Sequence, residues 1–160
     1  MAPRPVVVVI GAGFGGVAVA KDLRKQPVDV VLIDRRNYHL FQPLLYQVAT
    51  AGLNPGDIAQ PIRSMLRPGR HLDVVLGDVG TIDLDERRVH LLDGRDIAYG
   101  YLVVAAGAHT SYFGNDDWEH HAPGLKTVED AIEIRARVLS AFETADRSRD
   151  PDEQARSLAF

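Results

Sequence analysis

A glycine-rich turn between an apolar run and an amphipathic segment constrains the fold of this chain more than any other feature. Five β-branched residues, Val6–Ile10, directly precede the sequence Gly11-Ala12-Gly13-Phe14-Gly15-Gly16. A run of this kind without polar alternation is typical of a parallel strand buried on both faces. Residues 17–26 then carry apolar side chains at helical spacing, and residues 28–33 form a second apolar run. Together these segments predict a βαβ unit of the usual size.

The turn satisfies the pattern G-x-G-x-x-G through Gly11, Gly13 and Gly16. The first glycine permits a tight turn, the second lets the backbone approach a pyrophosphate, and the third allows close packing of helix on strand. Backbone N–H groups and the positive end of the helix dipole then attract the phosphates. Because the motif stands between a predicted strand and a predicted helix, it predicts dinucleotide binding.

Asp34 closes the second predicted strand, eighteen residues after Gly16. A carboxylate at this point accepts hydrogen bonds from ribose hydroxyls and disfavours a 2′-phosphate. Arg35 and Arg36 follow it and could accommodate NADP, so the choice of nucleotide stays open, and the motif does not separate FAD from NAD. A structural glycine turn with a surface aspartate is the alternative interpretation.

Composition excludes several classes of function. The formal net charge of −4 leaves no excess of basic residues to neutralise a nucleic-acid backbone. With no cysteine, the chain has no disulfide, thiolate metal site or cysteine nucleophile. The uncharged, mainly apolar stretch near the start of the chain, residues 5–20, is shorter than the roughly 20 residues of a spanning helix. We therefore expect a cytoplasmic protein with no membrane anchor of its own and no nucleic-acid partner.

The remaining segments predict further elements. Residues 35–61 are irregular and rich in aromatic and amide side chains, with a short helix over 58–66. Residues 72–98 predict a small antiparallel meander that includes the alternating segment 72–76. Residues 101–105 predict another buried strand.

The last third of the chain predicts one long helix. Thr127 followed by Asp130 is a capping-box signature at its start. An apolar stripe follows in Val128, Ile132, Leu139 and Phe142, and residues 148–154 have the composition of a surface loop.

Longer runs carry a resemblance to a known family. The run Asp34-Arg35-Arg36-Asn37-Tyr38-His39-Leu40-Phe41-Gln42-Pro43-Leu44-Leu45-Tyr46-Gln47-Val48-Ala49-Thr50 closely resembles the type II NADH dehydrogenases, which are single-subunit NADH:quinone oxidoreductases. The runs Tyr101-Leu102-Val103-Val104-Ala105 and Ala122-Pro123-Gly124-Leu125-Lys126-Thr127 extend it, and the resemblance covers essentially all 160 residues.

The resemblance implies FAD as the nucleotide on the glycine turn, with NADH and a quinone as substrates of the complete enzyme. Electron transfer would belong to the flavin, so no residue of this chain is expected to be catalytic. The implied cofactor-binding residues are Gly11, Ala12, Gly13, Phe14, Gly15, Gly16, Asp34, Arg35, Gln42, Pro43, Leu44, Val79, Ala105, Ala106 and Gly107.

Within this set, Asp34 would hold the adenosine ribose, Arg35 would lie near the adenine, and Val79 would offer backbone contacts to the adenine. Gln42-Pro43-Leu44 would lie beside the flavin. Two positions depart from the family: Ala106 stands where threonine is usual, and His109-Thr110 reverses the commoner order. Related disulfide reductases carry a cysteine pair beside the flavin, which this chain lacks.

The resemblance implies an α/β fold, a Rossmann-like FAD-binding domain with a small antiparallel meander, incomplete at the C-terminus. Residues 1–160 would be the N-terminal part of that domain. The NADH-binding domain and the membrane-docking region, which would hold the complete enzyme on the cytoplasmic face of the membrane, are absent from them. Two alternatives stay open: a non-catalytic dinucleotide-binding module, and a single-domain NAD-dependent dehydrogenase, which lacks support because no Tyr-x-x-x-Lys pair occurs.

One further cluster of side chains could be read as a metal site. His120 and His121 with Asp116 and Asp117 have metal-ligating side chains, but neighbouring residues do not share a helix face, so we expect a polar surface loop and no metal.

Overall fold

The computed structural model describes residues 3–67 and 69–159, which form two compact units. The first unit holds the described residues up to 39 together with Ala59–Ala108. The second holds Leu40–Ile58 together with the described residues from 109 onward.

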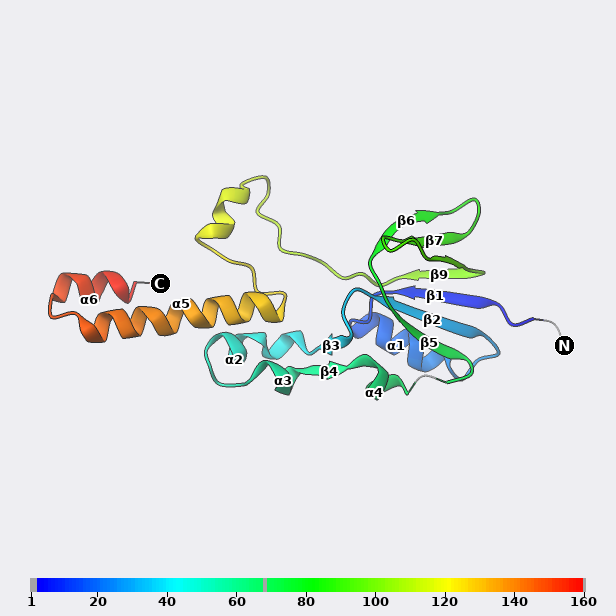
Figure 1. Ribbon diagram of the computed structural model, residues 1–160, viewed down its shortest axis with the longest axis horizontal. Coiled ribbons are helices and arrows are strands. Elements are labelled where there is room, and N and C mark those ends of the chain that lie inside the picture. The colour runs from blue at the N-terminus through cyan, green and yellow to red at the C-terminus, as the bar shows by residue number, and fades with distance from the viewer. Residues whose placement is uncertain (1–2, 68, 160) are drawn as a thin grey trace. The chain divides into compact units, whose positions relative to one another are not determined.

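The first unit is built on a four-stranded parallel sheet with the strand order β5-β2-β1-β9 (Figure 1). The strands are β1 (Val6–Ile10), β2 (Asp29–Asp34), β5 (Leu72–Leu76) and β9 (Tyr101–Val104). β1 lies inside the sheet between β2 and β9, which explains its continuous β-branched sequence. The predicted parallel strands are therefore confirmed.

The two faces of this sheet are covered differently. Val7 and Val9 of β1 belong to a core that includes helix α1 (Phe14–Leu23) and helix α4 (Ile62–Leu66). Val8, which points to the opposite face, packs in a second cluster with residues of the meander. The unit thus has three layers, with helices on one face of the parallel sheet and antiparallel strands on the other (Figure 1).

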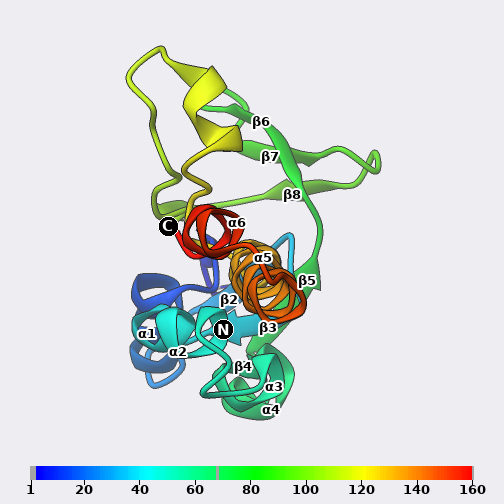
Figure 2. The same cartoon turned by 90° about the vertical axis from the view of Figure 1, so that its left-hand side faces the viewer.

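The meander is confirmed, but its first predicted strand belongs elsewhere. It consists of β6 (Val79–Asp83), β7 (Arg88–Leu91) and β8 (Asp96–Ala98), paired antiparallel (Figure 2). The segment 72–76, which alternation assigned to it, is β5 and pairs in parallel with β2. Alternating burial only reports that one face of a strand is covered, and it does not identify the neighbouring strand.

Strand β9 differs from the buried strand expected there. Tyr101 and Val104 are 64% and 63% exposed, because β9 lies at the edge of the sheet and among the described residues pairs only with β1. A run of apolar residues does not report whether a strand is central or at an edge.

The segment 35–61 is more regular than its composition suggests. It contains β3 (Tyr38–Leu40) and β4 (Ala59–Pro61), which pair as a two-stranded sheet, with short helices between them. The helix predicted over 58–66 is replaced by helix α3 (Pro55–Ile58), β4 and α4. Pro61 interrupts the predicted helix, since it lacks the N–H that the helix interior needs.

In the second unit, helix α5 (Val128–Arg147) packs against helix α2 (Leu45–Ala49), which follows a 3₁₀ turn at Gln42–Leu44. The capping box of α5 is confirmed: the Thr127 hydroxyl accepts from the Asp130 N–H at 3.0 Å, and the Asp130 carboxylate accepts from the Thr127 N–H at 2.9 Å. The predicted apolar stripe is buried only at its start, since Ile132, Leu139 and Phe142 are 46–55% exposed.

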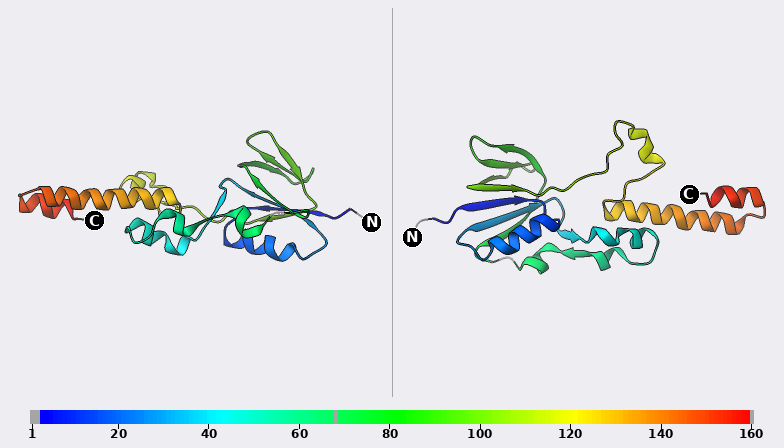
Figure 3. Two further views of the ribbon diagram at one scale, coloured as in Figure 1. Left: turned by 60° about the horizontal axis from the view of Figure 1, so that its bottom comes forward. Right: turned by 180° about the vertical axis from the view of Figure 1, so that it is seen from behind.

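Helix α6 (Pro151–Ser157) replaces the surface loop predicted over 148–154 and folds back beside α5 (Figure 3). The Asp150 carboxylate accepts from the Asp152 N–H at 3.0 Å, and Pro151 begins the helix. Asp followed by Pro is an N-terminal helix signal, and the charged composition of this segment concealed it.

Candidate dinucleotide-binding site

The glycine turn connects the carboxyl end of β1 with the N-terminus of α1, and two of its glycines are required by packing. Gly11 has a φ of +99°, and a Cβ on it would lie 2.4 Å from the Ala105 carbonyl oxygen. A Cβ on Gly16 would lie 1.7 Å from the Gly11 carbonyl oxygen. Any larger residue at either position therefore forces the strand, turn and helix apart.

Gly13 has a different environment. Its φ is −70°, which any residue adopts, and a Cβ on it would have no described atom within 4 Å. Helix α1 begins at the next residue, and among the described residues no side chain caps its N-terminus. The turn therefore presents open space beside helix N–H groups, an arrangement that suits an anionic group.

Asp34 lies at the carboxyl end of β2, beside this turn. Its Oδ2 atom accepts from the Ala12 N–H at 2.6 Å, and its Oδ1 atom accepts from the Arg36 N–H at 2.8 Å. Each carboxylate oxygen has a further lone pair that can accept a ribose hydroxyl. The carboxylate thus holds the glycine turn in place and also offers acceptors for a ribose. The spacing between Gly16 and Asp34 predicted the acceptors but not the contact with the turn.

Other predicted site residues of the first unit lie at the same end of the parallel sheet, where its strands have their carboxyl ends. Ala105 follows β9, donates its N–H to the Ile10 carbonyl at 2.7 Å, and packs against Gly11. Gly107 follows with a φ of +76°. The Gly77 N–H donates to the Asp34 carbonyl at 2.9 Å, so the turn that leads into Val79 lies at the end of β2. Arg35 is exposed beside Asp34.

The remaining predicted residues belong to the second unit. Gln42, Pro43 and Leu44 form the 3₁₀ turn before α2, and the Gln42 amide donates to the Lys126 carbonyl at 3.3 Å. The residues that were predicted to form one cofactor-binding site are therefore divided between the two units of the structure.

His39 is the residue of the turn region that sequence reasoning missed. It is the only polar or charged side chain among the buried described residues, at 7% exposure. Its Nδ1 atom lies 2.9 Å from the Ala12 carbonyl oxygen, and its ring meets the Phe14 ring edge to face with centroids 5.0 Å apart. The sequence feature that could have drawn attention to it is a histidine between Tyr38 and Leu40 in an extended segment. Nothing in the sequence indicated which group it would form a hydrogen bond with.

Arg95, which lies between β7 and β8, connects the meander to the end of β5 through a hydrogen bond. The Arg95 guanidinium donates to the Asp93 carboxylate at 2.6 Å and to the Leu76 carbonyl at 2.6 Å. Its hydrogen bond holds the pKa of the Asp93 carboxyl below its ordinary value. The hydrogen bond to Leu76 holds the start of the turn between β5 and β6, and Val79 is the first residue of β6 after this turn.

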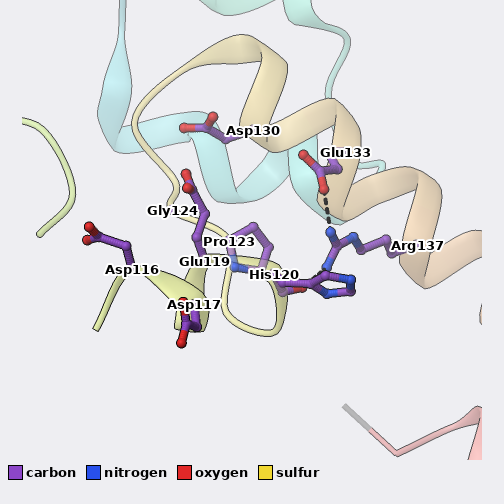
Figure 4. Close-up of a pocket in the computed structure, with 9 residues that line it drawn as sticks. All are labelled: Asp116, Asp117, Glu119, His120, Pro123, Gly124, Asp130, Glu133 and Arg137. Carbon is purple, nitrogen blue, oxygen red and sulfur yellow. Dashed lines mark hydrogen bonds and ion pairs between the residues drawn. The ribbon is translucent and has the colours of Figure 1, made fainter. Parts of the chain in front are cut away.

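The second unit has a hollow of about 400 Å³ between the segment 116–124 and α5 (Figure 4). Arg137 lines it and donates to Glu133 at 2.5 Å and to the His120 carbonyl at 2.8 Å. Nearby, burial raises the pKa of the Tyr112 phenol, and the Glu119 carboxylate adds to the effect. Within residues 3–67 and 69–159, no three His, Asp or Glu side chains are arranged to hold a metal ion.

Among the described residues, no helix is both long and apolar enough to cross a membrane.

Comparison with known proteins gives a consistent relationship. Residues 5–146 match the pyridine nucleotide-disulphide oxidoreductase family. The chain is 52% identical over 160 residues to the type II NADH:quinone oxidoreductase Ndh of Mycobacterium tuberculosis, covering 98% of this chain and 35% of that protein. It is 50% identical to NdhA of the same organism, covering 98% of this chain and 34% of that protein. The chain thus spans about a third of the length of these relatives.

Solved structures support the fold. The sulfide:quinone oxidoreductase of Aquifex aeolicus superposes with a TM-score of 0.77 at 28% identity, covering 88% of this chain and 33% of that one. NDH2 of Plasmodium falciparum superposes with a TM-score of 0.82 at 24% identity, covering 95% of this chain and 32% of that one. Both matches extend over most of this chain and about a third of the other.

Proposed function

The chain belongs to the pyridine nucleotide-disulphide oxidoreductase family, and from this premise we propose that it is the FAD-binding part of a type II NADH:quinone oxidoreductase. The resemblance of residues 34–50 to that family and the 52% identity to the mycobacterial enzyme support this assignment. In this proposal the chain is the N-terminal part of the FAD-binding domain, and the complete enzyme oxidises NADH and reduces a quinone at the cytoplasmic face of the membrane.

The observation that carries the proposal is the open space over Gly13, at the N-terminus of α1. Among the described residues, no side chain caps this N-terminus. A pyrophosphate fits such a cradle because the first N–H groups of a helix lack intrahelical acceptors. Asp34, at the end of the adjacent strand, has lone pairs for the ribose hydroxyls. The residues present therefore fit the ADP half of FAD.

The proposed roles of the chain's residues are binding and orientation. Gly13 and the first turn of α1 would hold the pyrophosphate, Asp34 the ribose, and the turn 105–107 would pass close to the cofactor. Arg35 and the backbone of Val79 would contact the adenine, while Gln42-Pro43-Leu44 would lie beside the flavin. When bound, FAD accepts a hydride from NADH and passes electrons on to the quinone.

Equilibrium titration of the purified chain tests the proposal. We expect saturable binding of FAD and of ADP, and much weaker binding of FMN, because FMN lacks the adenosine and the pyrophosphate that the glycine turn would hold. Failure of both FAD and ADP to bind at millimolar concentration contradicts the proposal. Binding of FMN as tight as that of FAD contradicts the assignment of the pyrophosphate to the turn.

A second measurement addresses activity. The 160 residues contain one G-x-G-x-x-G motif, which the proposal assigns to FAD, and no second one for NADH. We therefore expect the purified chain, supplied with FAD, NADH and a water-soluble quinone, to oxidise NADH slowly. Turnover equal to that of a full-length relative would contradict this expectation.

A further inference from the structure

Ala12, the residue between the first two glycines of the turn, is held at both of its backbone polar groups. It is 2% exposed, and its N–H donates to Asp34 Oδ2 at 2.6 Å. Its carbonyl oxygen lies 2.9 Å from His39 Nδ1. A carbonyl oxygen only accepts hydrogen bonds, so the Nδ1 atom carries the proton in this contact.

The two hydrogen bonds fix two successive peptide planes. The Ala12 N–H belongs to the peptide between Gly11 and Ala12, which Asp34 therefore orients. The Ala12 carbonyl belongs to the peptide between Ala12 and Gly13, which His39 orients. Because this peptide is trans, its C=O and N–H groups point in opposite directions. Holding the carbonyl toward His39 thus turns the Gly13 N–H away from His39.

His39 is itself well fixed, as this role requires. It lies in β3 at 7% exposure, and the edge-to-face contact with Phe14 restrains its ring. The strand is anchored just before it, where the Ile62 N–H donates to the Asn37 carbonyl at 3.1 Å. Phe14 is the first residue of α1, so one ring contacts both the turn and the start of the helix.

We propose that His39 is a positioning residue for the pyrophosphate: its hydrogen bond to the Ala12 carbonyl aims the Gly13 N–H at the phosphate oxygens. This inference rests on the proposed function, since it concerns the same site. His39 would not touch the nucleotide and would act only through the peptide plane that it orients. An N–H group held in advance toward a phosphate loses less freedom on binding than a mobile one.

Two isosteric variants separate this role from simple packing. In His39→Asn the amide nitrogen occupies the place of Nδ1 and can donate to Ala12, whereas in His39→Gln it occupies the place of Nε2 and cannot. We expect the Kd for ADP to stay within about threefold for His39→Asn and to rise about tenfold for His39→Gln, close to the lower limit for the loss of one hydrogen bond to a charged group. His71→Asn is the matched control, because His71 pairs with Asp29 at 2.7 Å outside the turn, and it should leave the Kd unchanged.

The Gly13 amide proton reports the proposed contact directly. In the wild-type protein and in His39→Asn, ADP should shift its NMR resonance downfield, as a hydrogen bond to phosphate does, and this shift should shrink in His39→Gln. Equal affinities and equal Gly13 shifts in the two variants overturn the inference while leaving the proposed function intact. Absence of any ADP or FAD binding by the wild-type protein counts against the proposed function itself.

The wild-type protein also supplies a test that needs no variant. Nitrogen-15 spectra of the neutral His39 ring should give the tautomer protonated at Nδ1. A ring protonated only at Nε2 overturns the inference even if the variants fail to fold.

Discussion

The three motif glycines occupy different environments, and the differences separate folding from binding at the scale of single residues. Gly11 and Gly16 are required by the fold, since a side chain at either would collide with backbone atoms of Ala105 or Gly11. Gly13 is not, since its dihedral angles suit any residue and no described atom approaches its Cβ position. The fold alone therefore gives no reason for a glycine at position 13, whereas an approaching phosphate does.

Alanine at these positions should separate the two roles. We expect Gly16→Ala to lower the free energy of unfolding by about 3 kcal/mol, as overpacking at a fixed backbone does. Gly13→Ala should change it by less than about 1 kcal/mol, because alanine restricts the unfolded chain but is a poorer N-cap residue than glycine. Its Kd for ADP should rise at least tenfold, about 1.4 kcal/mol. Urea denaturation and ADP titration of both variants measure these effects.

Gly56 offers a control, because a Cβ on it also meets no described atom within 4 Å and it lies outside the turn. Gly56→Ala should leave ADP binding unchanged. If Gly13→Ala binds ADP as tightly as the wild type, the pyrophosphate does not approach this residue, and the assignment of the turn is wrong.

At the scale of elements, helix α5 illustrates what local sequence can and cannot specify. Its start was predicted from Thr127 and Asp130 because a capping box involves only neighbouring residues. Its apolar stripe was misjudged because burial depends on what lies opposite. Ala131 is fully buried where α5 packs on α2, whereas Phe142, farther along the helix, is 55% exposed.

The cap gives a quantitative prediction for this helix. Thr127→Ala removes the hydroxyl that accepts from the Asp130 N–H, and we expect it to lower the free energy of unfolding by about 1 kcal/mol. Thr127→Ser keeps the acceptor and should lose only a few tenths of that amount. Urea denaturation followed by circular dichroism at a helix wavelength measures both. Equal losses in the two variants would mean that the methyl group of Thr127 stabilises the helix, not its hydroxyl.

At the scale of the whole molecule, protection of the first unit should follow its sheet order. β1 is paired on both sides and buried on both faces, with Val8 and Val9 fully buried. β9 pairs with β1 on one side only among the described strands. In a parallel strand alternate N–H groups point to opposite neighbours, so an edge strand leaves half of them open to water.

Hydrogen exchange should reveal this order. We expect the amides of Val7, Val8 and Val9 to be among the slowest of the chain, and alternate amides of β9 to exchange much faster. Measurements at several protein concentrations supply the control for self-association. Uniform protection of β9 at low concentration would contradict the edge position, and protection that increases with concentration would indicate that two copies pair at this edge.

The sequence by itself determined the features that depend on neighbouring residues. These are the β-branched strand, the turn that only glycine allows at Gly11 and Gly16, the acid at the end of the next strand, and the cap of α5. Their signals are local because φ angles, helix N–H groups and side-chain alternation each involve a few consecutive residues. The resemblance of residues 34–50 to the type II NADH dehydrogenases is likewise a property of the amino-acid sequence alone.

Only the tertiary structure decided which strand pairs with which and which apolar faces are covered. It assigned β5 to the parallel sheet, exposed Val104 at the edge, and divided the predicted site residues between two units. It also brought His39 to the carbonyl of Ala12, twenty-seven positions away along the chain. Each of these outcomes depends on contacts between distant segments, and no local pattern of residue types records the partner in such a contact.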